Sequence, residues 1–227
     1  MNYPYLLFDA DNTLFDFDKA NRTAFSAVCT EHDIPDTEEN FRTYEQCNAR
    51  MWAAFDRGEV TKDFLVVQRY RDFLAAIGLD RSAEGCNHTH LTTLGISNVL
   101  LPYAEEVCRE LSRTHRLLYL VTNAVASVQR ERLRRSTIVP YITDAFISEE
   151  AGAAKPSTEY FDYVFAHIDG ITRENCIVIG DSLSSDIKGA NNYGLPCCWY
   201  NPKGVARPAD LRIDYEITDL RQLFDIV

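Results

Sequence analysis

The sequence lacks a long apolar run, and this absence excludes several classes of protein. Nowhere among its 227 residues do apolar side chains continue for the roughly 18 positions that a membrane span requires. The short apolar stretch Tyr5 to Phe8 meets acidic residues at once, which is too early for a signal peptide. We therefore expect a protein that has no membrane contact and is located in the cytoplasm.

Positive charge is also scarce in this chain. Lys and Arg number 23 against 34 for Asp and Glu, so the formal net charge is -11. The average surface would repel a polyanion, and we expect no nucleic-acid polymer as a partner. A small phosphate ester would bind only where the potential is reversed locally, for example by a metal ion together with a lysine.

The seven cysteines lack the spacing of a metal or redox motif. No Cys-x-x-Cys pair occurs, and several of the cysteines lie in apolar stretches. An odd number of cysteines without regular spacing is typical of a reduced chain rather than of a disulfide framework. We expect them to be small buried hydrophobic residues.

Short apolar runs predict buried strands along much of the chain. These runs are Tyr5 to Phe8, Leu117 to Val121, Ala145 to Ile147, Cys176 to Ile179 and Pro196 to Tyr200. Amphipathic stretches of helical length lie between them, which favours parallel βαβ units in a sheet covered on both faces. The expected fold class is therefore α/β, with a Rossmann-like parallel sheet. In such sheets, ligands bind at the carboxyl ends of the strands.

The segment from residue 16 to residue 91 breaks this alternation. It has helical patterning at Ala20 to His32, Glu38 to Arg57 and Lys62 to Ile77, and no convincing strand. We expect two domains: an α/β core made of residues 1–15 and 92–227, and an inserted all-helical cap made of residues 16–91. A short last strand and helix are expected within residues 214–227.

Two carboxylates directly follow the first predicted strand. Asp9 and Asp11 stand two positions apart where the chain leaves the sheet, so both can converge on one reaction centre. In such a pair, one carboxylate can attack as a nucleophile while the other manages protons. An acidic turn after a strand has the same pattern, so the pair alone leaves both interpretations open.

Further polar residues in the predicted core fit the same chemistry. Thr122 and Asn123 can hydrogen-bond phosphoryl oxygens, and Lys155 can neutralise a phosphate and an attacking carboxylate. Asp181 and Asp186 add carboxylate oxygens, the hard ligands that suit Mg²⁺. Each signal is weak alone, because ordinary loops and surface lysines have the same residues. Their order and their places near strand ends together indicate a single phosphate-handling site.

These motifs resemble those of a known family. Asp-x-Asp-x-Thr-Leu, Thr-Asn, Lys-Pro and Gly-Asp-Ser-x-x-Ser-Asp occur here in the order of the four motifs of the haloacid dehalogenase superfamily. The resemblance covers essentially the whole chain, including the helical insertion, which is similar to the mobile cap of that family. It implies a magnesium-dependent phosphomonoester hydrolase that acts through an aspartyl-phosphate intermediate.

The resemblance also implies a set of metal ligands and two catalytic carboxylates. Asp9 would be the nucleophile and would bind Mg²⁺ as well. Asp11 would be the general acid and base, with its backbone carbonyl on the metal. Asp181 would ligate Mg²⁺, and Asp186 would support it directly or through water.

Three more core residues would act on the phosphate itself. Thr122 and Asn123 would bind the phosphoryl group, and Lys155 would be a catalytic residue that balances charge. An aspartate that attacks a phosphate ester brings like charges together. A metal ion and a lysine beside them remove most of that repulsion.

The helical insertion holds the clue to the substrate. Its stretch around Asn48, Trp52 and Gly58 is similar to the YjjG-type pyrimidine 5′-nucleotidase branch of the superfamily. Trp52 and Phe55 would then stack on a base, and Asn48 or Arg69 would read the edge of that base. At helical spacing the two aromatic residues are also typical of a packed core. The substrate implied by the resemblance is a pyrimidine nucleoside 5′-monophosphate.

Two other functions remain open. A sugar-phosphate phosphatase or a phosphomutase of the same superfamily shares the four motifs and a similar cap. A signalling or binding domain that holds phosphate on Asp9 also presents an acidic cluster with Thr and Lys, although Asp11 is well placed to hydrolyse the adduct. For the enzyme, the expected partner is a small phosphate ester, and the chain is expected to be a monomer or a homodimer.

Overall fold

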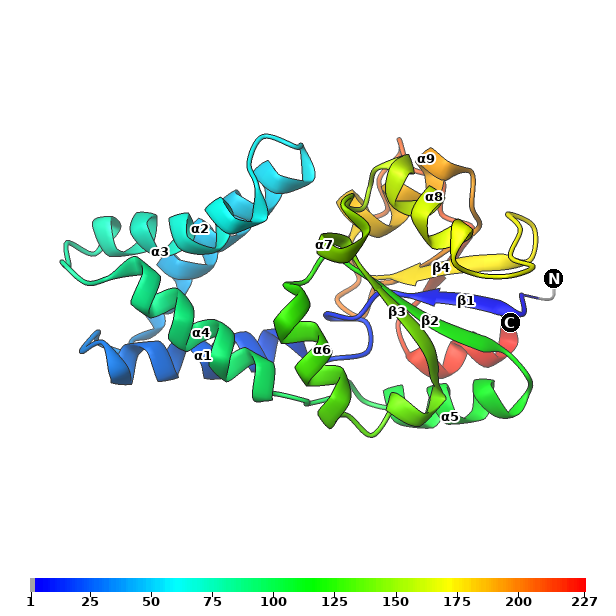
Figure 1. The fold of residues 1–227 in the computed structure, drawn as a ribbon, viewed down its shortest axis with the longest axis horizontal. Coiled ribbons are helices and arrows are strands. Elements are labelled where there is room, and N and C mark those ends of the chain that lie inside the picture. The colour runs from blue at the N-terminus through cyan, green and yellow to red at the C-terminus, as the bar shows by residue number, and fades with distance from the viewer. Residues whose placement is uncertain (1–2) are drawn as a thin grey trace.

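The computed structural model describes residues 3–227 and shows a six-stranded sheet with a helical insertion beside it (Figure 1). The strands are β1 (Tyr5–Phe8), β2 (Leu117–Thr122), β3 (Ile142–Ile147), β4 (Cys176–Gly180), β5 (Cys197–Tyr200) and β6 (Tyr215–Ile217). Their order is β3-β2-β1-β4-β5-β6, and all neighbours are parallel. The predicted α/β class with a Rossmann-like parallel sheet is confirmed.

Helices cover both faces of the sheet, because its central strands are apolar on both sides. In β1, Leu6 and Phe8 belong to the core on one face, whereas Leu7 belongs to the core on the other face. The first face is covered by α5 (Ala104–Arg113), α6 (Ala126–Arg135) and η3 (Leu220–Asp225). The second face is covered by α8 (Thr158–Ala166) and α9 (Lys188–Tyr193). The shorter elements are η1 (Val139–Tyr141), α7 (Ser148–Ala151) and η2 (Leu183–Ile187).

The helical insertion consists of the four helices between β1 and β2. They are α1 (Phe17–Glu31), α2 (Glu38–Asp56), α3 (Lys62–Ala76) and α4 (Ala83–Ile96). Each begins at a side chain that accepts a hydrogen bond from the backbone of the first turn: Asp16, Thr37, Thr61 and Ser82. The insertion has its own aromatic core, in which Phe25, Tyr44, Tyr70 and Phe73 contact one another.

Helix α4 is not among the helices predicted from the sequence. Its sequence is rich in threonine and glycine, which are poor helix formers, and it has no clear apolar stripe. It is helical because it packs against α1, α3 and α6, with Leu94 close to Ala20 and Val128. The expected boundary between residues 91 and 92 lies inside this helix, which continues to Ile96.

Two connecting segments, residues 14–17 and 97–101, join the insertion to the sheet and bind each other. The Asp16 amide donates to the Val99 carbonyl at 3.0 Å, and the Leu101 amide donates to the Leu14 carbonyl at 2.9 Å. Phe15 forms an isolated bridge with Leu100 between these bonds. The root of the insertion is thereby held beside the carboxyl end of β1.

Two expectations drawn from composition concern cysteines and membrane spans. All seven cysteines are free and buried, as expected for small hydrophobic residues. Among residues 3–227, no helix is both long enough and apolar enough to cross a membrane.

Candidate functional site

The carboxyl ends of β1 and β4 lie side by side at the centre of the sheet, and acidic motifs follow both strands. From β1 the chain adds β2 and β3 on one side, then returns to add β4, β5 and β6 on the other. The loops after β1 and β4 therefore lead away in opposite directions, and ligands of parallel α/β sheets bind in the crevice between such loops. Asp9 follows β1, and its amide donates to the Ile179 carbonyl of β4 at 2.8 Å.

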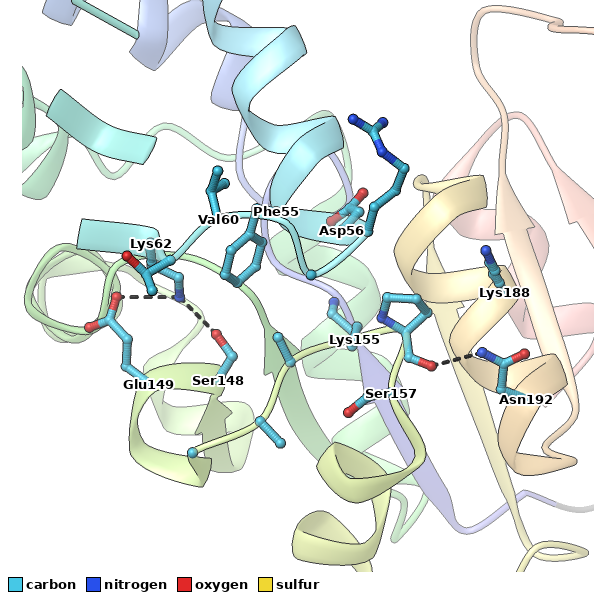
Figure 2. Close-up of a pocket in the computed structure, with 17 residues that line it drawn as sticks. Phe55, Asp56, Val60, Lys62, Ser148, Glu149, Lys155, Ser157, Lys188 and Asn192 are labelled. Carbon is cyan, nitrogen blue, oxygen red and sulfur yellow. Dashed lines mark hydrogen bonds and ion pairs between the residues drawn. The ribbon is translucent and has the colours of Figure 1, made fainter. Parts of the chain in front are cut away.

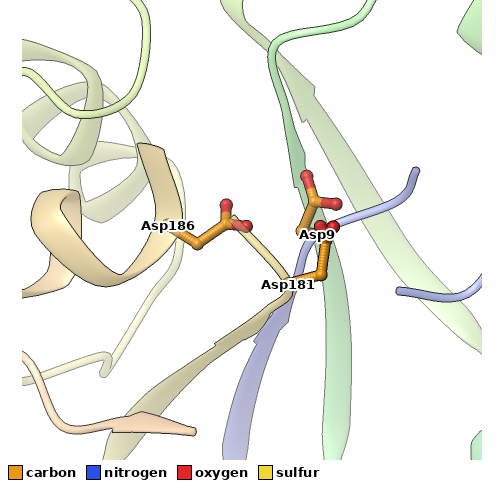
Figure 3. Close-up of side chains that lie close together, drawn as sticks. All are labelled: Asp9, Asp181 and Asp186. Carbon is orange, nitrogen blue, oxygen red and sulfur yellow. The ribbon is translucent and has the colours of Figure 1, made fainter. Parts of the chain in front are cut away.

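Three carboxylates converge in this crevice (Figure 3). Asp9, Asp181 and Asp186 each place one oxygen within 4.8 Å of the oxygens of the other two. Asp9 and Asp181 come from the strand ends, and Asp186 comes from η2. Asp9 and Asp186 are buried, while Asp181 is partly exposed. A convergent set of carboxylate oxygens is the donor type that Mg²⁺ prefers.

The buried ammonium group of Lys155 bridges two of these carboxylates. Its Nζ donates to Asp9 Oδ1 at 2.7 Å and to Asp186 Oδ1 at 2.6 Å. Burial alone would lower the pKa of Lys155, but the carboxylates of Asp186 and Asp9 outweigh burial and raise it. Lys155 is therefore a fixed positive charge at the centre of the site.

One lysine does not balance the negative charge of the cluster. Burial, followed by repulsion from Asp186, raises the pKa of Asp9 to about 7, although Lys155 opposes the shift. Burial, followed by repulsion from Asp9 and Asp186, raises the pKa of Asp181 to about 8. The fully ionised cluster is thus unfavourable without more positive charge. A divalent cation would supply that charge, so the charge of the site and its donor atoms both fit a metal ion.

Asp9 and Asp11 are each held by neighbouring side chains. The second oxygen of Asp9, Oδ2, accepts a hydrogen bond from the Thr13 hydroxyl at 3.3 Å. Asp11 is partly exposed, and its Oδ1 accepts a hydrogen bond from the fully buried Arg132 of α6. Both aspartates line one cavity of about 190 Å³, which we call the carboxylate cavity. The two carboxylates can therefore meet the same ligand.

The end of β2 and the loop after it bring Thr122 and Asn123 to the carboxylate cavity. The Thr122 hydroxyl accepts a hydrogen bond from the Ala124 amide at 3.1 Å. The Asn123 side chain accepts from the Lys155 amide at 3.0 Å and donates to the Lys155 carbonyl at 2.8 Å. The Asn123 side chain therefore fixes the backbone that carries the lysine.

The insertion contributes Asn48 and Trp52 to the carboxylate cavity. Trp52 also packs edge to face on Phe55, with ring centroids 5.7 Å apart, so its ring both packs within the insertion and lines the cavity. Arg69 does not line this cavity. It is buried and donates to Asn48 Oδ1 at 2.9 Å and to Asn87 Oδ1 at 3.3 Å. Arg69 therefore orients Asn48 in this structure.

A larger cleft of about 830 Å³ lies between the insertion and the core (Figure 2). The loop between α2 and α3 forms one wall, and the loop after α7 forms the other. Lys62 of the insertion donates to Ser148 of the core at 2.7 Å. Asp56 accepts a hydrogen bond from Ser184 of the core at 2.7 Å. Lys155 lines this cleft too, so the cleft reaches the carboxylate cluster.

Two contacts of Asp9 and Asp11 were not predicted from the sequence. Thr13 belongs to the motif that begins at Asp9, so its position was a usable signal. Arg132 gave no signal, because it stands in an arginine-rich stretch with exposed neighbours such as Arg134. Only the packing of α6 distinguishes the two arginines.

The sheet and its cluster of aspartates with one buried lysine define a class of hydrolase. The family described as haloacid dehalogenase-like hydrolase matches residues 3–194. The chain belongs to this family, and the family expected from the four motifs is confirmed.

Three similar proteins indicate which branch of the family the chain resembles. YfnB, a HAD-hydrolase of Bacillus subtilis, is 35% identical over 99% of this chain and 95% of that protein. Pyrimidine 5′-nucleotidase PynA of Streptococcus pneumoniae is 30% identical over 99% of this chain and 95% of that protein. Pyrimidine 5′-nucleotidase YjjG of Escherichia coli is 27% identical over 98% of this chain and 97% of that protein. The expected resemblance to the YjjG-type branch is confirmed.

A solved structure agrees with the whole fold. The crystal structure of YfnB bound to magnesium, which reveals an interdomain movement in that protein, matches with a TM-score of 0.95 at 34% identity. The match covers 100% of this chain and 99% of that chain.

Replacing Gly180 with alanine should disturb the cluster, because Asp186 packs directly on this residue. A Cβ at Gly180 would overlap Asp186 Oδ2, far inside contact distance. We expect Gly180→Ala to lower the free energy of unfolding by roughly 1–3 kcal/mol, the usual cost of overpacking. Urea unfolding measures this change.

The matched control for this prediction is Gly95→Ala in α4. The nearest atom to a Cβ there is 3.9 Å away, which is ordinary contact. Alanine should be neutral or stabilising at this helical position. Equal losses of stability in the two variants would contradict the prediction.

Proposed function

We propose that this protein is a magnesium-dependent phosphomonoester hydrolase that acts through an aspartyl-phosphate on Asp9. The observation that carries the proposal is the convergence of Asp9, Asp181 and Asp186 around the buried ammonium group of Lys155. Mg²⁺ held by these aspartates and by the Asp11 carbonyl would neutralise phosphoryl charge as the ester is attacked.

In the first half of the reaction, Asp9 forms a bond to phosphorus while the ester P–O bond breaks. Lys155 and Thr13 each hold one oxygen of Asp9, so the attacking carboxylate has a defined orientation. Thr122 binds the phosphoryl group at the end of β2. Asp11, in its protonated form, gives a proton to the leaving alkoxide.

In the second half, water attacks the phosphorus of the aspartyl-phosphate. Asp11, now a carboxylate, accepts a proton from that water as the bond between phosphorus and Asp9 breaks. Inorganic phosphate leaves, and both aspartates return to their starting states. Because Asp11 lines the same cavity as Asp9, the adduct would be hydrolysed rapidly rather than held as a signal.

We propose further that the helical insertion is a cap that selects pyrimidine nucleoside 5′-monophosphates. The names of the relatives PynA and YjjG support this substrate class. Asn48 and Trp52 support it as well, because they line the cavity that contains the nucleophile. Stacking of a base on Trp52 would contribute about 1–3 kcal/mol. Arg69 would act through Asn48, which it binds.

The setting of the reaction follows from the same proposal. The substrate is a small phosphate ester, and the enzyme acts in the cytoplasm as a monomer or a homodimer. The seven free, buried cysteines support a reducing compartment.

Two substitutions separate the proposed roles of Asp9 and Asp11. Asp9→Asn should abolish turnover and leave no covalent phosphate, because the nucleophile is lost. Asp11→Asn should slow turnover by roughly 10²-fold or more, the scale of general acid–base catalysis. The loss should be smallest for p-nitrophenyl phosphate, whose leaving group needs little proton assistance. Steady-state kinetics and mass spectrometry of quenched enzyme measure both effects.

The matched control for both variants is Asp210→Asn, which changes an exposed aspartate outside the site. It should retain wild-type activity. Substantial residual turnover by Asp9→Asn would mean that another residue is the nucleophile.

Magnesium should stabilise the folded protein, because it relieves the repulsion within the acidic cluster. A magnesium concentration 100 times its dissociation constant would add about 2.7 kcal/mol to the free energy of unfolding. Thermal unfolding with and without MgCl2 should therefore show a higher Tm in magnesium. Asp181→Asn should lose most of this increase, yet in chelator it should be at least as stable as the wild type, since it removes one repelling charge. An equal magnesium shift in the two proteins would remove Asp181 from the metal site.

The substrate proposal predicts a preference for uridine and thymidine 5′-monophosphates over purine nucleotides and hexose phosphates. Trp52→Ala should reduce the preference over hexose phosphates by about tenfold to a hundredfold, since stacking is lost. The measurement is kcat/KM across a panel of nucleotides and sugar phosphates. Phe64→Ala, which removes an exposed ring of the insertion, is the matched control. Hexose phosphates hydrolysed as well as nucleotides would refute the substrate class while leaving the phosphatase proposal intact.

A further inference from the structure

Arg132 differs from the other arginines of α6 because its charge is completely buried. The side chains of Arg130, Arg134 and Arg135 are 47%, 66% and 44% exposed, whereas that of Arg132 is 0% exposed. A buried guanidinium group is costly unless charged and polar partners compensate it. The partners of Arg132 therefore indicate why an arginine is placed here.

The charged partner of Arg132 is Asp11. Arg132 Nη1 donates to Asp11 Oδ1 and also to Gln129 Oε1 at 3.3 Å. Asp11 Oδ2 accepts no hydrogen bond from residues 3–227, and Asp11 lines the carboxylate cavity. One oxygen of Asp11 is therefore anchored while the other is available to a ligand.

The remaining contacts of Arg132 are with the two connecting segments. Its Nε donates to the Ser97 carbonyl at 3.1 Å, and its guanidinium carbon lies 4.6 Å from the centre of the Phe15 ring. Phe15 and Ser97 belong to different connecting segments, which are hydrogen-bonded to each other. Arg132 therefore connects Asp11 with both connecting segments of the insertion.

We propose that Arg132 is a positioning residue for Asp11. It holds Oδ1 so that Oδ2 faces the carboxylate cavity, and it ties this orientation to the place where the insertion meets the core. The proposal rests on the proposed phosphatase function, in which Asp11 transfers protons. Because a proton donor must be aligned with the departing oxygen, loss of the anchor slows proton transfer without removing the donor.

The test is a double-mutant cycle of Arg132→Gln and Asp11→Asn with two aryl phosphates. Phenyl phosphate has the more basic leaving group and depends more on proton donation than p-nitrophenyl phosphate does. Arg132→Gln should lower kcat/KM for phenyl phosphate, which reports the first half of the reaction alone, by roughly tenfold to a hundredfold, a part of the acid–base contribution. The loss should be several times smaller for p-nitrophenyl phosphate.

The cycle distinguishes positioning from a general effect on the structure. If Arg132 acts through Asp11, Arg132→Gln should cause no further loss in the Asp11→Asn background. Equal losses in both backgrounds, or equal losses for both substrates, would overturn the proposal. An Asp11→Asn enzyme with wild-type activity would instead refute the proposed role of Asp11 and with it the proposed mechanism.

Two further variants control for folding. Arg132→Lys keeps the positive charge without the planar fork, and it should recover part of the rate lost in Arg132→Gln. If Arg132→Gln does not fold, Arg132→Lys carries the same comparison across both backgrounds. Arg134→Gln removes an exposed arginine from the same helix and should leave kcat unchanged. Urea unfolding of each variant reports its stability.

Discussion

The molecule depends on a concentration of negative charge that a single buried lysine neutralises only in part. Lys155 contacts Asp9 and Asp186, yet the pKa values of Asp9 and Asp181 remain raised. Buried ion pairs contribute little net stability, since desolvation offsets much of their attraction. The cluster is therefore better explained by the proposed function, in which a cation supplies the positive charge that the cluster lacks.

The backbone around the cluster is built to hold these charges close together. The sheet brings the ends of β1 and β4 side by side, and the Asp9 amide is bonded to β4. Gly180 lets Asp186 approach the chain closely, and Asn123 binds both backbone polar groups of Lys155. Such preorganised charges would need no rearrangement during the proposed reaction, which is how electrostatic groups lower a barrier most effectively.

The insertion is joined to this rigid centre in a different way. Across the cleft, Lys62 and Asp56 make polar contacts with the core. At its root, the connecting segments are paired with each other and contact Arg132. The contact between Arg132 and Asp11 lies at this paired root rather than at the cleft.

The sequence alone determined the strands and the residues at their ends, including Asp9 and Asp181. An apolar run followed by a carboxylate is a local sequence pattern. The carboxyl ends of parallel strands lie at the same edge of a sheet, so the carboxylates that follow them come close together. The helix α4, the burial of Arg132 and the interior position of Arg69 were decided only by the tertiary structure. A helical period indicates which side chains share a face, but it does not say what that face meets. Whether an arginine is a surface charge or the buried partner of a carboxylate depends on residues far away in the chain, because only packing removes water from its charge.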